Sequence, residues 1–210
     1  MDKVNNIVLN SIKHWFIEVC KQGLKDSTVT AKEKVGILNS HGAIYQALGQ
    51  YDNALPFYED AAKLTKTIPN NEKQVATQLN NLALLLSDKG DYSGAEPLYR
   101  DALAIWKKSL GNDHPQVGTG LNNLASLLSD KGDYSGAEPL YRESLAIRKN
   151  ALGDDHPDVA QSLNNLARLL RDTGKKAEAR QLGREAYRID LKVLGSNHPQ
   201  TKSHQYWNTF

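Results

Sequence analysis

The feature of this sequence that most constrains its fold is an internal repeat of 42 residues. Residues 73–114 and 115–156 align without gaps and are identical at 32 of 42 positions, and residues 157–198 continue the same register. A more divergent copy precedes them at a spacing of 41 residues. Repeats of this length are supersecondary units that bury their apolar faces against their neighbours. We therefore divide the chain into an N-terminal segment, 1–30, four repeats at about 31–72, 73–114, 115–156 and 157–198, and a C-terminal segment, 199–210.

Each repeat predicts two antiparallel helices. In the second repeat, the apolar residues Leu79, Leu82, Ala83 and Leu86 follow the spacing of one helix face. No stretch alternates with the period of two that is typical of a half-buried strand. The sequence therefore predicts an all-α fold, an α-solenoid of stacked antiparallel helical hairpins with capping helices at its N- and C-terminal ends.

Glycine and proline mark where the helices of the second repeat end and where the next helix begins. We expect the first helix to stop at Gly90 and the second at Gly111, because glycine favours the residue just after a helix. The next helix is expected to open at Pro115, since proline is favoured at the first helical position.

Serine and aspartate predict how the second helices begin. Ser93 is followed three residues later by Glu96, which is the spacing of a capping box. Ser135 and Glu138 repeat this spacing in the third repeat. Asp52 holds the position of the serine in the first repeat, where we expect it to cap the helix.

Both ends of the array are expected to be covered, because a terminal hairpin leaves one apolar face without a neighbour. Residues 3–22 place apolar side chains on one helix face and predict the N-terminal cap. At the other end, the aromatic residues Tyr206, Trp207 and Phe210 are expected to cover the last hairpin.

The repeat resembles the tetratricopeptide repeat (TPR). The second repeat has packing residues where that motif has them, at Leu79, Leu82, Ala83, Leu86, Gly90, Tyr92, Ala95, Tyr99 and Ala102. The period of 42 residues and the segments LNNLA, GDYSGAEPLYR and LGNDHP are similar to the kinesin-light-chain type of the motif. The resemblance covers about residues 32–198 and implies a TPR superhelix whose first helices line a concave face. It also implies an acidic cargo peptide, although few basic residues line the predicted face of this chain.

One position of the first helix is asparagine in all four repeats: Asn39, Asn80, Asn122 and Asn164. Asparagine is a poor residue for a helix interior, so its recurrence suggests a task that a better helix former could not perform. The resemblance places this position on the concave face, where an amide can both donate to and accept from a peptide backbone. We predict that these residues bind a peptide; the alternative is that their amides bond to a neighbouring helix or loop. A structural role at the seam between repeats is favoured for the next residues, Asn81, Asn123 and Asn165.

Six more residues are predicted on the same groove face: Thr77, Thr119, Leu84, Ser126, Arg168 and Arg171. Arg168 and Arg171 lie about one helical turn apart and could bind one carboxylate jointly. The alternative is a solvated pair with Asp172 nearby.

Composition and charge argue against several classes of partner. Lysine and arginine number 26 and aspartate and glutamate 24, which gives a net charge of +2. Nucleic-acid binding usually requires a basic excess, because phosphate neutralisation dominates the affinity. No apolar run approaches the length of about 18 residues that predicts a membrane-spanning helix. The single cysteine, Cys20, allows no intrachain disulfide, and this fits a cytoplasmic location.

No motif in the sequence predicts a catalytic site, a metal or a cofactor. Three histidines precede prolines at equivalent repeat positions, at His114, His156 and His198. Equivalent residues of stacked helices lie about 10 Å apart, whereas the ligands of one zinc ion lie about 2 Å from the metal. We therefore expect these histidines in turns between repeats, and we expect His41 to be buried by packing. The chain is not expected to be an enzyme.

The sequence predicts a protein-interaction module. We expect a peptide or protein segment to bind in the concave groove, in an adaptor, chaperone-like or partner-masking role. Neither nucleic acid nor membrane insertion is expected. The alternative is a self-associating scaffold, a homo-oligomer joined through the repeat ends and the terminal aromatic residues.

Overall fold

The computed structural model describes residues 18–19 and 22–208, and the regular structure of this part is helical, without a strand. The predicted all-α fold is confirmed for these residues. Contacts divide the chain into two compact units, unit 1 (Met1–Leu98) and unit 2 (Tyr99–Phe210). The predicted N-terminal capping helix lies mostly outside the described residues; Val19, which is described, is 48% exposed.

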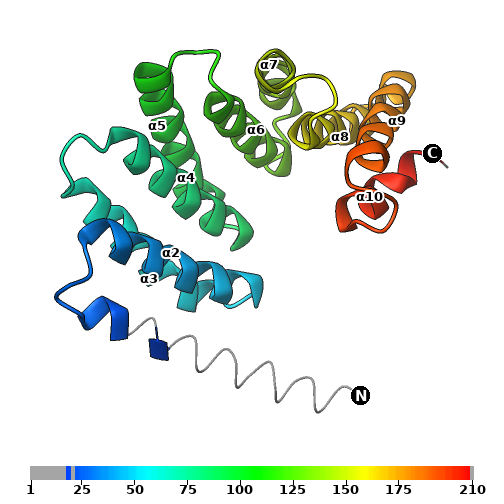
Figure 1. Ribbon diagram of the computed structural model, residues 1–210. Helices are drawn as coiled ribbons and strands as arrows, with labels where there is room; N and C mark the ends of the chain where they lie inside the picture. The colour runs from blue at the N-terminus through cyan, green and yellow to red at the C-terminus, as the bar shows by residue number, and fades with distance from the viewer. Residues whose placement is uncertain (1–17, 20–21, 209–210) are drawn as a thin grey trace, which may run out of the picture. The chain divides into compact units, whose positions relative to one another are not determined.

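Unit 1 is built from α2 (Ala31–Ala47), α3 (Tyr51–Lys66), α4 (Glu72–Asp88) and the first part of α5 (Tyr92–Leu110). Consecutive helices pack as antiparallel hairpins, with α3 against both α2 and α4 (Figure 1). Small residues let the helices approach: Ala54 is fully buried beside Tyr58 and Leu85. His41 is buried, as predicted, and its ring stacks on Phe57 with the ring centroids 4.7 Å apart.

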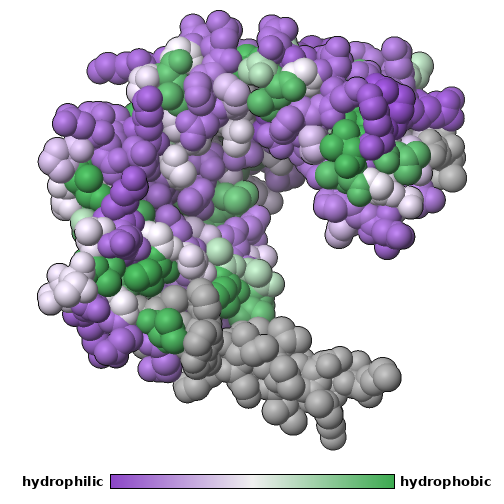
Figure 2. Space-filling model, viewed as in Figure 1, coloured by the Kyte–Doolittle hydropathy of each residue, from purple (hydrophilic) through white to green (hydrophobic). Residues whose placement is uncertain are grey.

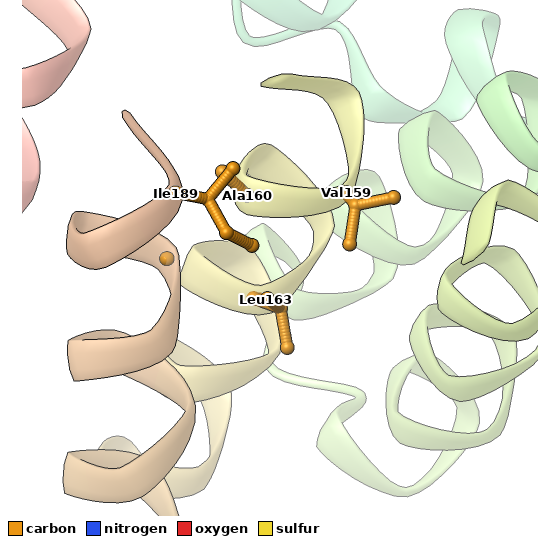
Figure 3. Packing of buried hydrophobic residues seen from close by; sticks show 5 residues of the cluster. Val159, Ala160, Leu163 and Ile189 are labelled. Carbon is orange, nitrogen blue, oxygen red and sulfur yellow. The ribbon is translucent and has the colours of Figure 1, made fainter. Parts of the chain in front are cut away.

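Unit 2 continues the pattern from the second part of α5. Its further helices are α6 (Pro115–Asp130), α7 (Tyr134–Leu152), α8 (Pro157–Asp172), α9 (Lys176–Val193), α10 (Pro199–His204) and the 3₁₀ helix η1 (Gln205–Asn208). Figure 3 shows Val159, Ala160 and Leu163 of α8 in the core with Ile189 of the facing helix α9. Each of these four side chains is fully buried. The hairpins are therefore held by burial of apolar surface, which contributes about 25 cal/mol per Å².

The viewed surface of both units is largely hydrophilic, with hydrophobic residues in separate small areas (Figure 2). In the part of the chain that the structure describes, no helix is both long and apolar enough to cross a lipid bilayer.

The helix ends predicted from glycine and proline are confirmed in the second repeat. After α4, Gly90 has a φ of +86°, in the left-handed region that favours glycine. The Asp91 N–H then donates to the Leu86 carbonyl at 2.8 Å, so the last turn closes as a Schellman motif. Helix α5 ends at Leu110, and α6 begins at Pro115.

The predicted capping boxes of the second helices are wrong. The Asp133 carboxylate caps α7 by accepting from the Gly136 N–H at 2.9 Å, and Ser135 donates its hydroxyl to the same oxygen. Asp91 accepts from Gly94 and from Ser93 at α5 in the same way. The helices begin at the tyrosine after each aspartate, so Ser93 and Ser135 lie inside the first turn.

The predicted cap at Asp52 is also wrong, because α3 begins one residue before it. Gln50 is the N-cap of α3 and makes no capping bond with its side chain. Asp52 instead lies within the first turn, where a carboxylate still interacts favourably with the helix dipole.

The three histidines before proline cap the first helices that follow them. The imidazole Nδ1 of His114, His156 and His198 accepts the backbone N–H two residues later, at 3.1–3.3 Å. The residues therefore lie in turns between repeats, as predicted, and in addition satisfy a helix N-terminus.

Replacing His156 by alanine is expected to lower the free energy of unfolding by about 1 kcal/mol, the typical contribution of an N-cap side chain. Urea unfolding followed by circular dichroism measures this change. His156→Asn is the matched control, because asparagine also accepts a capping hydrogen bond. If both variants unfold at the wild-type urea concentration, the His156 bond contributes nothing to stability.

Candidate functional site

Two of the recurring asparagines in unit 2 accept hydrogen bonds from the next repeat. Asn165 Nδ2 donates to Asn122 Oδ1 at 3.1 Å. Trp207 Nε1 donates to Asn164 Oδ1 at 2.7 Å. Trp207 is 42 residues after Asn165, so the two donors occupy equivalent repeat positions. The asparagines thus form a ladder that ties α6 to α8 and α8 to η1.

This ladder limits how the asparagines could contact a peptide. Asn80, Asn122 and Asn164 are 7–8% exposed. With one lone pair of Oδ1 already used by Trp207, Asn164 has its Nδ2 group and at most one further acceptor site to offer a ligand. Asn39 is half-buried, and its Oδ1 has no hydrogen-bond partner among the described residues. A peptide-binding role for this set stays a prediction, and at Asn122 and Asn164 the amides also bond to a neighbouring helix or segment.

A polar cleft with a volume of about 400 Å³ lies between α6, α7 and α8 of unit 2. Its lining residues are Ser126, Ser129 and Asp130 of α6, Tyr134 and Tyr141 of α7, and Asn165, Arg168, Leu169 and Asp172 of α8. Two of the predicted groove residues, Ser126 and Arg168, therefore meet here. Arg168 is exposed and makes no ion pair within the part of the chain that is described. The cleft can recognise polar groups through both donors and acceptors.

Burial changes the acid–base behaviour of two groups in the polar cleft. It raises the pKa of Asp130, and the positive charge of Arg168 offsets part of this effect. Burial also raises the pKa of Tyr141 to about 12, and the nearby Ser126 hydroxyl offsets part of this effect. Tyr141 therefore remains a neutral hydrogen-bonding group at physiological pH.

A smaller pocket of about 220 Å³, which we call the terminal pocket, lies at the other side of α8. It is lined by Asn164, Arg168, Arg171, Ser203, Tyr206 and Trp207. Arg171 forms an ion pair with Asp172 at 2.8 Å, and its guanidinium lies 5.9 Å from the centroid of the Tyr206 ring. Both predicted arginines line this pocket, and their joint binding of one carboxylate stays a prediction. Arg171 also forms its ion pair with Asp172, which agrees with the alternative that Asp172 lies beside the two arginines.

The other predicted groove residues are placed differently. Thr77 donates its hydroxyl to the Lys73 carbonyl, and Thr119 accepts from Arg148 Nη2 at 3.1 Å. Leu84 is 41% exposed on α4. Thr77 and Leu84 belong to unit 1, as do Asn39 and Asn80, and none of the four lines the polar cleft or the terminal pocket.

A pair of buried residues that the sequence patterns did not predict lies at each contact between a first helix of unit 2 and the second helix before it. One residue comes from a second helix and its partner from the first helix of the next repeat. The pairs are Trp106 with Gly120, Arg148 with Ser162, and Asp190 with His204. The signal was present in the alignment, because repeats that are otherwise nearly identical carry Trp, Arg and Asp at one position.

Arg148 is the most unusual member of these pairs. It is only 5% exposed, and it donates to the Asp158 carbonyl, to Ser162 Oγ and to Thr119 Oγ1 at 2.9–3.1 Å. Burial lowers the pKa of its guanidinium, because a charge is costly in a dry environment. These neutral acceptors tie α7 to α6 and α8, so Arg148 positions the helices that form the polar cleft.

Trp207 closes the last hairpin. It is 2% exposed, whereas Tyr206 is 46% exposed. The repeat position that holds Tyr99 and Tyr141 is Gly183 in the last repeat, and a Cβ there would collide with the Trp207 ring. The tryptophan therefore fills the space that a tyrosine fills in earlier repeats. The predicted aromatic cover is confirmed for Trp207; Phe210 lies outside the described residues.

Within the described residues, no group of three or more His, Cys, Asp or Glu side chains could hold a metal ion. Cys20 is not among the described residues.

Comparisons with known proteins agree with this architecture. The tetratricopeptide repeat family model matches residues 35–108, 74–150 and 119–192. No match was found among curated proteins.

Solved structures give the same result. BtubC (BKLC) from P. vanneervenii is 27% identical with a TM-score of 0.71, covering 90% of this chain and 76% of that chain. A putative kinesin light chain with nearly identical TPR-like repeats from Podosopora anserina is 25% identical with a TM-score of 0.67, and 81% of each chain is covered. The Rap conjugation gene regulator of plasmid pLS20, solved with the Phr* peptide, is 17% identical with a TM-score of 0.77, covering 91% of this chain and 51% of that chain.

The family matches together extend over residues 35–192, which is more than half of the chain. They coincide with helices α2 to α9, whose paired arrangement the structure shows independently. The protein therefore belongs to the tetratricopeptide repeat family, and its repeats are of the kinesin-light-chain-like kind that the sequence motifs predicted.

Proposed function

We propose that the protein is an interaction module that binds a segment of a partner protein, and that α6 and α8 of unit 2 supply a main contact surface. The observation that carries this proposal is the polar cleft. It is concave, it is lined by donors and acceptors, and its cation Arg168 is exposed. Groups of this kind fix the orientation of a bound chain.

The fold supports this proposal. The Rap regulator has the same fold and was solved with a peptide, so a helical solenoid of this kind can hold one. The proposed role is that of a cytoplasmic adaptor, a chaperone-like holder or a protein that masks its partner, and it involves no catalytic step. In unit 1, the residues proposed to contact the partner segment are Asn39, Asn80, Thr77 and Leu84.

Arg168→Ala is expected to weaken binding of a peptide about tenfold, because a hydrogen bond to a charged group contributes about 1.5–3 kcal/mol. The peptide is first selected by the full wild-type chain from a random phage-displayed library of 12-residue peptides. Its synthetic, fluorescein-labelled form is then titrated by fluorescence anisotropy. Arg168 is an exposed residue, so the melting temperature should stay close to that of the wild type.

Lys108→Ala is the matched control, since Lys108 is an exposed cation on α5 that lines neither pocket of unit 2. It should bind the selected peptide with wild-type affinity. Equal weakening by both variants would show that overall charge, and not the polar cleft, determines binding. Failure of the wild-type chain to select any peptide would contradict the proposed function.

A further inference from the structure

Unit 1 contains a glutamine that joins a tyrosine to an aspartate across two repeats. The Tyr58 hydroxyl donates to Gln46 Oε1 at 2.8 Å, and Gln46 Nε2 donates to Asp88 Oδ2 at 2.6 Å. A carboxamide suits this position because it accepts with one atom and donates with the other. Unit 1 thus contains an example of the chemical group, a carboxamide, that bonds to a phenol and a carboxylate placed in this way.

The equivalent phenol and carboxylate of unit 2 are Tyr141 and Asp172, and both line the polar cleft. The residue equivalent to Gln46 is Ser129, whose side chain is much shorter. No hydrogen bond joins Ser129 to Tyr141 or Asp172 among the described residues. The cleft of about 400 Å³ therefore lies where the amide of a glutamine lies in unit 1.

Donor and acceptor groups remain for a ligand in this cleft. Arg171 contacts Asp172 through Oδ1 only, and Oδ2 makes no hydrogen bond within the described chain. The equivalent atom of Asp88 is the one that accepts from Gln46. The Ser126 hydroxyl lies close enough to that of Tyr141 to lower its pKa in part, and both residues line the cleft. The two hydroxyls have two protons, and a bond between them would use only one, so at least one can be donated to a ligand oxygen.

The charges around the cleft favour a neutral ligand group. Asp172 is paired with Arg171, and the charge of Arg168 acts on Asp130, so two carboxylates are balanced by two guanidinium groups. A charged ligand group would meet charges of both signs around the cleft, so its attraction to one kind of group would be offset by repulsion from the other. A neutral carboxamide avoids this repulsion and still makes bonds with both sides of the cleft.

We propose that the polar cleft binds a carboxamide side chain, glutamine or asparagine, of the partner segment. Its oxygen accepts from the Tyr141 and Ser126 hydroxyl pair, and its NH₂ group donates to Asp172 Oδ2. The bound amide thereby takes the place that Gln46 holds in unit 1. This inference rests on the proposed function, since it specifies which side chain of the bound segment enters the cleft.

The test is to repeat the selection from the random 12-residue library with a variant that supplies its own amide. Ser129→Gln places a glutamine where unit 1 has one, so it should fill the cleft. Peptides selected by the wild type should be enriched in glutamine or asparagine at one aligned position. Replacing that residue by leucine should weaken binding to the wild type about tenfold, the effect of losing one or two hydrogen bonds. The Ser129→Gln variant should bind both peptides equally.

Ser196→Gln is the matched control, because Ser196 is exposed in the loop after α9 and lines neither pocket. It should keep the wild-type preference for the amide. Asp172→Ala is a second variant, which should lose the preference by removing the acceptor and which does not depend on Ser129→Gln being folded. Wild-type peptides without an amide, or with an acidic or basic residue in its place, would overturn this inference and leave the proposed function intact. Selection of no peptide at all would overturn both.

Discussion

Replacing Trp207 by alanine is expected to lower the free energy of unfolding by about 3–5 kcal/mol, the range for removing a buried aromatic side chain. The side chain is 2% exposed, and its Nε1 donates to Asn164. Gly183 provides the space that the ring occupies, so the surrounding helices can collapse onto the cavity only in part. Urea unfolding of the full chain, followed by circular dichroism at 222 nm, measures the loss.

Tyr206→Ala is the control for this prediction. Tyr206 is the preceding residue, but it is 46% exposed, so its removal should change stability by less than about 0.5 kcal/mol. If Trp207→Ala is as stable as Tyr206→Ala, the tryptophan does not close the array. A concentration-dependent mass that Trp207→Ala abolishes would then favour the self-associating scaffold, in which the terminal aromatics join two chains.

The helices could be predicted from the sequence because their signals are local. Leu79, Ala83 and Leu86 fall on one face of α4 whatever surrounds them, and Gly90 and Pro115 specify backbone geometry at their own positions. The N-caps show the limit of such signals. Asp91 and Ser93 are both good capping residues two positions apart, and the choice depends on where the helix begins.

The site was less predictable because its contacts join residues of different repeats. The recurrence of Asn122 and Asn164 was visible in the sequence, but their partners Asn165 and Trp207 are 43 residues away. The polar cleft arises where one repeat has Ser129 and another has Gln46. The sequence shows this difference, but it indicates a cleft only once the hydrogen bond from Gln46 to Asp88 is known.

The second large effect is expected at the buried pair of Asp190 and His204. Their side chains are 0% and 2% exposed, and Nδ1 of the histidine lies 2.6 Å from a carboxylate oxygen. Gln200 also donates to Asp190, at 3.1 Å. His204→Ala should lower the free energy of unfolding at neutral pH by about 3–5 kcal/mol, because it leaves a buried carboxylate without its partner.

The pH dependence of this loss has a definite sign. Burial raises the pKa of Asp190 above its ordinary 3.8 and lowers the pKa of His204 below 6.5, so the folded pair holds one proton over a narrower range of pH than the unfolded chain does. In the wild type, the Asp190 shift therefore lowers stability as the pH rises from 3.8 through the folded pKa of Asp190, and the His204 shift raises stability as the pH rises from the folded pKa of His204 to 6.5. In the His204→Ala variant, only the raised pKa of Asp190 contributes to the pH dependence of stability at this site. The unfolded chain releases the proton first, so stability falls as the pH rises from about 4 through the folded pKa.

Urea unfolding of the wild type, His204→Ala and Asp190→Ala/His204→Ala at pH 5 and pH 8 tests this argument. The loss in His204→Ala should be larger at pH 8, where keeping Asp190 protonated or burying its charge costs most. The double variant has neither group, so the change in its stability between the two pH values measures the pH dependence of all other groups and is the reference for the other two chains. An equal loss at pH 5 and pH 8 in His204→Ala would show that Asp190 reaches water when its partner is removed. In that case only Trp207 would stabilise the last repeat through its burial, and the Asp190–His204 pair would not.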